Sequence, residues 1–211
     1  MRCTIDHLTV TAPTLESGAQ YVRQALGVTP GPGGQHPRMG THNLLLRLGE
    51  SAFLEVIAPD PGARRPDRPR WFGLDDPAVL REPRLAAWVA RTQTLRDCPA
   101  DVLAVVGTIE TMTRGAREWL ITIPADGSLP MGGAMPMLIE WQSPREPAGQ
   151  GLPESGCSLN LLMVKHPEKA LARSLHASAG LVDSLRISEG EASLRASILT
   201  PQGVRFIGAP A

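Results

Sequence analysis

Two glutamates that stand in similar apolar stretches are the residues of this sequence best placed to do chemistry. Glu55 lies in residues 53–59 (FLEVIAP) and Glu140 in residues 138–144 (LIEWQSP), and each acid precedes a proline by four positions. An ionised carboxylate in a protein interior is costly unless it is paired, hydrogen-bonded or bound to a metal ion. Two such acids on matching strands therefore predict a shared metal or catalytic site.

The first block of the chain predicts the elements that position Glu55. It reads as a strand at 3–10, a helix at 15–26, a glycine-rich loop at 31–40 with room for a short strand, and strands at 43–48 and 52–58. Thr14 is the expected N-cap of the helix, and Gly27 is expected just after its end. His7 lies near the middle of the first strand, where alternation gives its side chain one face of the sheet.

The same order of elements recurs further along the chain. The second block reads as a strand at 84–91, a helix at 95–103 that Pro99 weakens, and strands at 108–113, 119–124 and 137–142. The third reads as a strand at 157–164, a helix at 167–179, and strands at 181–188, 191–199 and 203–207. Repetition of one supersecondary unit predicts that the units pack together, because an isolated sheet with a helix on one side leaves its other face bare.

The repeat predicts an α+β fold of β-α-β-β-β modules. We divide the chain into a first module (1–59), a connection (60–83), a second module (84–144), a linker (145–156) and a third, βαβββ-like module (157–211). The connection is rich in Pro, Arg and Asp and has little expected regular structure. Its Trp71 and Phe72 belong either to a lid over a site or to a linker that buries its aromatics in the core, and we favour the linker.

The composition argues against several classes of protein. The 211 residues include 21 Lys and Arg and 21 Asp and Glu, so no excess charge favours a nucleic acid or an anionic membrane as partner. The longest apolar runs are too short to span a membrane, and the N-terminus lacks a signal-peptide core. The three cysteines are scattered, which is typical of reduced thiols. We expect a soluble, cytoplasmic protein.

Most of residues 4–142 resembles the glyoxalase-like branch of the vicinal oxygen chelate superfamily. The resemblance rests on residues 6–8 (DHL), 33–37 (GGQHP) with 40–43 (GTHN), 54–55 (LE) and 138–141 (LIEW). It implies paired modules whose mixed sheets curl around a cavity, and many members of the superfamily hold a divalent metal there. It also implies that His7, Glu55 and Glu140 line the cavity as metal ligands.

The chemistry of these residues is consistent with that implication. An imidazole with two carboxylates suits Zn, Ni, Mn or Fe(II) and leaves positions open for substrate oxygens. Such an ion polarises a carbonyl or stabilises an enediolate, and Glu55 or Glu140 could leave the ion to move a proton as the catalytic group. No dinucleotide or phosphate-loop motif is present, so we expect no organic cofactor.

One position departs from the metal-binding pattern. Trp88 stands where His7 does in the first block, and metal-binding relatives often place a further ligand there. Three alternatives follow from this. The metal has only three protein ligands, or His36 supplies a fourth from its loop, or the site has lost the metal and binds an organic ligand. We expect His36, Asn43, Trp88 and Trp141 to contact that substrate or ligand.

Three functional hypotheses remain open. The first is a metal-dependent lyase, isomerase or dioxygenase that acts on a small oxygenated substrate. The second is a non-catalytic protein that binds or sequesters a small molecule on the same fold. The third is a scaffold whose cavity is filled by side chains. Because the third module has no fourth module to pair with, we also expect a homodimer.

Overall fold

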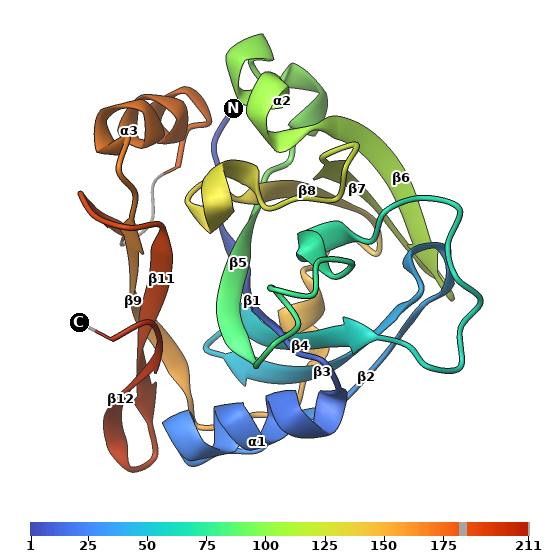
Figure 1. Cartoon of the computed structure of the whole chain (residues 1–211), viewed down its shortest axis with the longest axis vertical. Coiled ribbons are helices and arrows are strands. Elements are labelled where there is room, and N and C mark those ends of the chain that lie inside the picture. Colours follow the sequence, from blue (N-terminus) through green and yellow to red (C-terminus); the bar gives the residue numbers. More distant parts are fainter. Residues whose placement is uncertain (182–184, 211) are drawn as a thin grey trace.

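The computed structural model of the chain describes residues 1–181 and 185–210 (Figure 1). Its larger sheet has eight strands in the order β2-β3-β4-β1-β5-β8-β7-β6. These strands are β1 (Thr4–Thr11), β2 (Gly31–His36), β3 (Thr41–Leu48), β4 (Ala52–Pro59), β5 (Arg84–Arg91), β6 (Thr108–Arg114), β7 (Arg117–Ile123) and β8 (Met137–Ser143). The helices are α1 (Leu15–Leu26), α2 (Ala100–Val106) and α3 (Lys169–Ser178). In the described ranges, none of these helices has the length and apolar character needed to span a membrane.

The larger sheet consists of two modules that join at its centre. β1 pairs with β4 in parallel in the first module, and β5 pairs with β8 in parallel in the second. β1 and β5 pair with each other antiparallel, and His7 lies opposite Val89 at this junction. The sheet curls so that one face is concave, with α1 and α2 on the outside (Figure 1). The predicted α+β fold, with a curled mixed sheet, is confirmed.

The helix α1 has the bounds and caps that the sequence predicts. The Thr14 hydroxyl accepts a hydrogen bond from the backbone N–H of Ser17, and Gly27 adopts a left-handed conformation with φ 75°. The helix packs closely on β4, because a Cβ atom at Gly18 would overlap Val56. This packing closes the outer face of the strand that carries Glu55.

The second module has a shorter helix than predicted. A 3-10 turn, η3 (Leu95–Asp97), replaces the first part of the predicted 95–103 helix, and α2 begins only at Ala100. Pro99 explains the difference, because it cannot donate a helical hydrogen bond and it restricts the preceding residue to extended backbone. Cys98 accordingly has φ −62° and ψ 129°.

The third segment forms a separate four-stranded sheet in the order β10-β9-β11-β12. Its elements are β9 (Ser158–Lys165), α3, β10 (Leu185–Ser188), β11 (Ser193–Thr200) and β12 (Gly203–Gly208). Residues 182–184 of the predicted strand at 181–188 lie outside the described residues. The chain order is β-α-β-β-β, but β9 pairs in parallel with β10, whereas β1 and β5 pair in parallel with the last strand of their modules. The third sheet therefore differs in strand order from the first two modules.

Two apolar clusters lie on the two faces of the larger sheet. The outer cluster includes Leu54 and Val56 of β4 with Val22 and Leu26 of α1. The concave cluster includes side chains from the connection between the modules, where the 3-10 turn η2 (Trp71–Gly73) enters the curl of the sheet (Figure 1). Trp71 and Phe72 are only 3% and 2% exposed. The connection thus buries its aromatics in the core and also covers the concave face.

Candidate functional site

A small cavity lies on the concave face of the larger sheet. Its volume is about 40 Å³, which holds one or a few water molecules. Its polar lining consists of His7, His36, Asn43, Glu55 and Arg114. With Trp141 of β8, which also lines the cavity, the structure therefore brings together five of the site residues expected from the sequence, and it adds an arginine from the end of β6.

His7 is held between two carboxylates. Its Nδ1 atom lies 2.7 Å from Oδ1 of Asp6, and its Nε2 atom lies 3.7 Å from Oε2 of Glu55. An ionised carboxylate only accepts hydrogen bonds, so Nδ1 carries the proton that Asp6 binds. The 3.7 Å separation is too long for a hydrogen bond, so Nε2 and Glu55 face each other unbonded.

Asp6 reaches this site because β1 is irregular. Consecutive side chains on a regular strand point to opposite faces, yet Asp6 and His7 are hydrogen-bonded neighbours. The register of β1 against β5 shifts between Ile5 and His7, which is the signature of a β-bulge. The indole N–H of Trp141 also donates to Asp6, at 3.0 Å. Asp6 thus fixes the orientation of two residues of the site.

Glu55 is oriented by Asn43 from the neighbouring strand. The Asn43 Nδ2 atom donates to Oε1 of Glu55 at 2.6 Å, and the Oδ1 atom of the same side-chain amide accepts from the backbone N–H of Gly34 at 2.7 Å. The second bond decides which end of the amide faces Glu55. A Cβ atom at Gly33 would overlap Asn43, so the glycine-rich strand β2 can approach this side chain closely. Glu55 is only 5% exposed, and among the described residues no hydrogen bond reaches its Oε2 atom.

His36 and Arg114 form a second polar group in the cavity. Arg114 Nη1 lies 3.3 Å from His36 Nε2, and because a guanidinium only donates, Nε2 is the acceptor. The Nδ1–H of His36 then donates to the Thr41 hydroxyl at 3.3 Å. Burial, followed by the charge of Arg114, lowers the pKa of His36 to about 3. Burial also lowers the pKa of Arg114, although the charge of Glu55 opposes that shift. His36 is therefore a neutral imidazole at neutral pH.

The structure places Glu140 outside the cavity. Ile139 and Trp141 line the cavity, and alternation along β8 turns Glu140 to the other face. There its carboxylate accepts hydrogen bonds from the backbone N–H of Leu95 at 2.7 Å and from the side chain of Gln142 at 2.8 Å. Glu140 therefore binds the turn η3 instead of lying beside His7 and Glu55.

The strand register explains why the two glutamates differ. His7 lies opposite Phe53 of β4, so Glu55 lies two positions beyond that partner. The equivalent pair in the second module is Val89 and Met137, so the position equivalent to Glu55 is Ile139. A shift of one residue moves a side chain to the opposite face of the sheet. Matching the two stretches by sequence therefore pairs Glu55 with Glu140, whereas matching them by strand pairing pairs Glu55 with Ile139.

Trp88 is also turned away from the cavity. The residue opposite His7 is Val89, and the Trp88 indole N–H donates to the carbonyl oxygen of Gly133 at 3.2 Å on the outer side. Its ring packs edge-on against His176 of α3. Trp88 therefore joins the larger sheet to the third segment.

The predicted three-ligand metal set is not brought together. His7 and Glu55 are close, but Glu140 lies on the other face of the sheet. In residues 1–181 and 185–210, no group of three or more His, Cys, Asp or Glu side chains has the arrangement that a metal ion needs. This geometry does not fit the set expected from the sequence.

Aromatic side chains close the cavity on the side of the connection. Trp71 donates its indole N–H to the Thr41 hydroxyl at 3.2 Å and packs edge-on against His36. Phe72 adopts a left-handed backbone conformation, with φ 58°, which is rare for a bulky residue. Among the residues singled out here, Asp6 and Arg114 had no assigned role in the sequence analysis. The repeat does not reveal them, because a bulge positions Asp6 and a hairpin positions Arg114.

A cluster of opposite charges holds the connection near the edges of the curled sheet. Glu110 of β6 contacts Arg68 of the connection and Arg38, which follows β2, each at 2.5 Å. We call these three residues the Glu110 cluster. Together with the contact of Arg114 with His36, the cluster links β6 at one edge of the sheet to the β2 end at the other.

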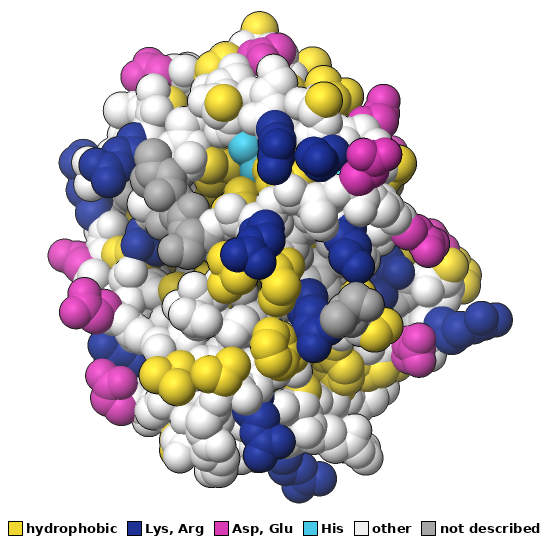
Figure 2. All heavy atoms as spheres, turned by 90° about the vertical axis from the view of Figure 1, so that its left-hand side faces the viewer, with side chains coloured by type: hydrophobic (Ala, Val, Ile, Leu, Met, Phe, Trp, Pro, Cys, Tyr) yellow, Lys and Arg dark blue, Asp and Glu magenta, His cyan; other side chains and the backbone are white. Residues whose placement is uncertain are grey.

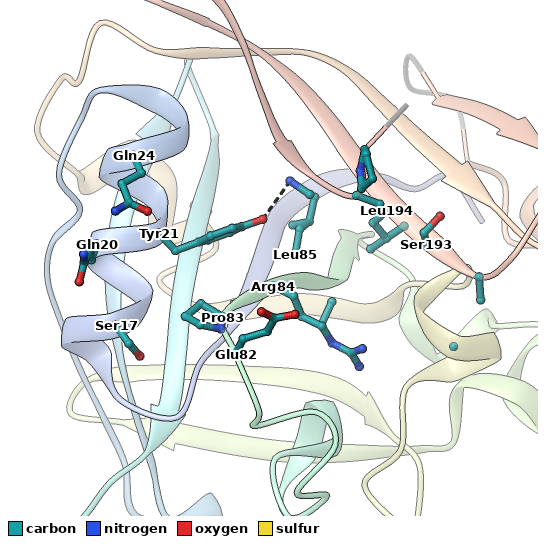
Figure 3. A pocket seen from close by; sticks show the side chains of 16 residues that line it. Ser17, Gln20, Tyr21, Gln24, Glu82, Pro83, Arg84, Leu85, Ser193 and Leu194 are labelled. Atoms are coloured by element: carbon teal, nitrogen blue, oxygen red, sulfur yellow. Dashed lines mark hydrogen bonds between the residues drawn. The ribbon is translucent and has the colours of Figure 1, made fainter.

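A larger open hollow lies elsewhere, between α1, the start of β5 and the third segment (Figure 3). It has a volume of about 580 Å³ and is lined by polar side chains that include Gln20, Glu82 and Arg84. The Tyr21 hydroxyl projects into it and accepts a hydrogen bond from the backbone N–H of Gly208 at 3.1 Å. None of the site residues expected from the sequence lines this hollow.

The fold and the cavity define the class of protein. Two β-α-β-β-β modules that form one curled sheet around a cavity make this a protein of the vicinal oxygen chelate class. Residues 5–179 match the family model described as the glyoxalase-like domain. The chain belongs to this family.

Solved structures similar to this chain have low sequence identity to it, and the first described here shares its fold. A hypothetical protein from Staphylococcus aureus has a TM-score of 0.64 and 14% identity, over 91% of this chain and 88% of that chain. Methylmalonyl-CoA epimerase of Streptomyces coelicolor has a TM-score of 0.43 and 13% identity, over 64% of this chain and 94% of that chain. The Mycobacterium tuberculosis epimerase has a TM-score of 0.39 and 16% identity, over 64% of this chain and 84% of that chain. No curated protein sequence matches the chain.

Proposed function

We propose that the protein is an enzyme that transfers a proton on a small oxygenated substrate, in an isomerase or lyase reaction. The observation that carries this proposal is the buried arrangement Asp6–His7 facing Glu55–Asn43 on the concave face. Acid–base catalysis needs a carboxylate or imidazole with an available atom directed at the substrate. His7 Nε2 and Glu55 Oε2 support the proposal because both groups line the cavity.

Each polar group has a distinct role in the proposal. Glu55, held through Oε1 by Asn43, takes a proton from a carbon next to a carbonyl with its free Oε2. Negative charge then develops on the carbonyl oxygen. His7, held by Asp6 with its proton on Nδ1, has an unprotonated Nε2 that accepts the proton of a neighbouring substrate hydroxyl and returns it to the carbonyl oxygen. The positive charge of Arg114 stabilises the negative charge that develops on that oxygen. Proton transfer by a positioned side chain contributes roughly 10²- to 10⁴-fold to the rate.

A metal ion has no step in this proposal. His7 Nε2 and Glu55 Oε2 offer two ligands, but Glu140 is engaged by Leu95 and Gln142 on the other face. Dioxygenase chemistry at a non-haem iron uses three protein ligands on one side of the ion, so the geometry favours the isomerase or lyase alternatives. Metal dependence stays a prediction, which elemental analysis of wild type beside His7→Ala tests.

The alternative of non-catalytic binding is favoured by one observation. The cavity measures only about 40 Å³ and is walled by Trp71, Trp119 and Trp141. A ligand larger than a few water molecules would need the connection that carries Trp71 to move aside, and it would then contact a mostly apolar wall. An aromatic pocket of this kind binds apolar ligands without chemistry.

Deuterium exchange separates the two alternatives. Small 2-oxo acids, hydroxyketones and thioesters are incubated in D₂O with wild type, with Glu55→Gln and with the surface control Glu118→Gln, and loss of the C–H signal is followed by NMR. The proposal predicts exchange by wild type and by Glu118→Gln, and a loss of roughly a hundredfold or more in Glu55→Gln. Ligand-induced stabilisation without exchange of any bound compound would instead support a binding protein.

The expected location and assembly remain part of this proposal. Cys98 and Cys157 are buried and form no disulfide in the described part of the chain, which supports a cytoplasmic protein. A homodimer is supported by the outer face of the third segment, where hydrophobic and basic side chains are interspersed (Figure 2). Val204 and Phe206 there are 55% and 47% exposed. The molar mass in solution, measured by light scattering, tests the dimer, and a monomeric mass would contradict it.

A further inference from the structure

A second hollow, distinct from the catalytic cavity, adjoins it at Trp141. It has a volume of about 550 Å³ and lies where the start of β1, the ends of β5 and β8, and the turn before β4 meet. Three arginines contribute to its lining, Arg2, Arg91 and Arg145, against one acid, Glu140. Hydroxyl groups of Ser51 and Thr94 also line it.

The charges of this hollow are unbalanced. The Glu140 carboxylate is occupied by the hydrogen bonds from Leu95 and Gln142. Arg2 and Arg145 make no ion pair with any residue in the described part of the chain. The hollow thus presents two guanidinium groups without a counter-charge, although the whole chain has a net charge of zero. A concave surface with an excess of one charge concentrates ions of the opposite sign.

Arg91 connects the hollow to the catalytic cavity. Its guanidinium donates to the carbonyl oxygen of Ile5 and to the Ser51 hydroxyl, both at 2.8 Å, so its position is fixed. It also lies 3.8 Å from Oδ2 of Asp6, the atom that accepts the Trp141 indole N–H. An anion bound to Arg91 would therefore change the environment of Asp6 and of the Trp141 N–H.

We propose that this hollow is a binding site for the anionic group of a small molecule, a carboxylate or a phosphate. Arginine is suited to both, because its planar fork donates two parallel hydrogen bonds to a pair of anionic oxygens. Arg91 supplies a preoriented donor, and Arg2 and Arg145 supply exposed ones. The hydroxyls of Ser51 and Thr94 supply further hydrogen bonds.

The test uses the Trp141 indole N–H as a local reporter. Uniformly ¹⁵N-labelled full-length protein is titrated with inorganic phosphate at constant ionic strength, and the Trp141 signal is assigned with Trp141→Phe. The chain has four tryptophans, so the other three indole signals serve as internal references. The proposal predicts a saturable shift of the Trp141 signal with a Kd on the order of 1 mM.

Variants decide whether the shift belongs to this hollow. The double variant Arg2→Gln, Arg145→Gln should weaken phosphate binding by roughly tenfold. Arg186→Gln removes an exposed arginine from β10 and should bind as wild type does. No saturable shift, or equal shifts in all three proteins, would overturn the proposal.

A parallel titration with malonate distinguishes the sources of the anionic group. Tighter binding of phosphate assigns the site to a phosphate ester, and tighter binding of malonate assigns it to a carboxylate; either supports an anion site. Because the readout is binding, the result does not depend on whether the cavity catalyses proton transfer.

Discussion

The Nε2 atom of His7 faces the Oε2 atom of Glu55 across 3.7 Å inside the concave cavity. The other nitrogen of His7 is bound to Asp6, and the other oxygen of Glu55 is bound to Asn43. Each group thus keeps one atom free and directed toward the other. A substrate atom that lies beside this pair, about 3 Å from each, would contact an imidazole and a carboxylate at once. This is the geometric basis of the proposed proton transfer.

The bond between Asn43 and Glu55 should be measurable as a coupling free energy. Asn43→Ala leaves a buried carboxylate without its donor, and we expect the free energy of unfolding to fall by about 1–3 kcal/mol. The double variant with Glu55→Ala should lose less than the sum of the single variants, by roughly 1.5–3 kcal/mol, because the bond is charge-assisted. Urea unfolding of the four proteins measures this. Additive effects would show that the bond contributes nothing.

The folded protein should lose stability in acid partly through His36. Its pKa falls from an ordinary value of 6.5 to about 3 on folding, mainly because of burial. Between these two values the unfolded chain binds a proton that the folded chain does not, so the free energy of unfolding falls as the pH falls below about 6.5. The loss by pH 4 should be roughly 3 kcal/mol.

A His36→Gln variant isolates this contribution. Glutamine can still contact Arg114 and Thr41 but does not titrate. Urea unfolding between pH 7 and pH 4 should show a shallower decline in the variant than in wild type. Parallel declines would contradict the assignment.

The Glu110 cluster should control how often the connection opens. Glu110→Gln weakens the contacts with Arg68 and Arg38, and amide hydrogen exchange in residues 60–83 should become faster by roughly tenfold if the cluster contributes about 1.4 kcal/mol to the closed state. Hydrogen–deuterium exchange mass spectrometry measures this, with Glu118→Gln as a matched control on the neighbouring strand. Unchanged exchange in Glu110→Gln would mean that Trp71 and Phe72 hold the connection without help from these charges.

Glu140 should matter for stability. Its carboxylate accepts the backbone N–H of Leu95 at the start of η3, in the manner of a helix cap. We expect Glu140→Ala to lower the free energy of unfolding by about 1 kcal/mol, since Leu95 loses its partner. Chemical denaturation checks this against Glu118→Ala, and an effect no larger than that of the control would show that the turn does not need the acid.

The sequence was sufficient for much of the fold and for one half of the cavity. Local signals positioned α1, because Thr14 and Gly27 mark its ends, and alternation together with the resemblance placed His7 and Glu55 on a common cavity. His36 and Asn43 reach the same place because the glycine-rich strand β2 pairs with β3 beside β4.

The other half of the cavity depends on registers that local patterns do not contain. Glu140 follows the same motif as Glu55, but pairing of β5 with β8 puts Ile139 in the equivalent position. Trp88 is likewise one position away from Val89, the residue that lies opposite His7. A β-bulge brings Asp6 to the site, and Arg114 lies at the end of the hairpin formed by β6 and β7. Neither feature produces a periodic signal in the sequence.

The central claim is that Glu55, and not Glu140, serves as the proton-transfer group. The direct measurement is the rate of C–H deuterium exchange for one exchanging carbonyl compound with wild type, Glu55→Gln and Glu140→Gln at equal folded concentration. We predict a loss of roughly a hundredfold or more in Glu55→Gln and a rate within about twofold of wild type in Glu140→Gln. A Glu55→Gln variant that exchanges as fast as wild type, or a Glu140→Gln variant that alone loses the activity, would contradict the account.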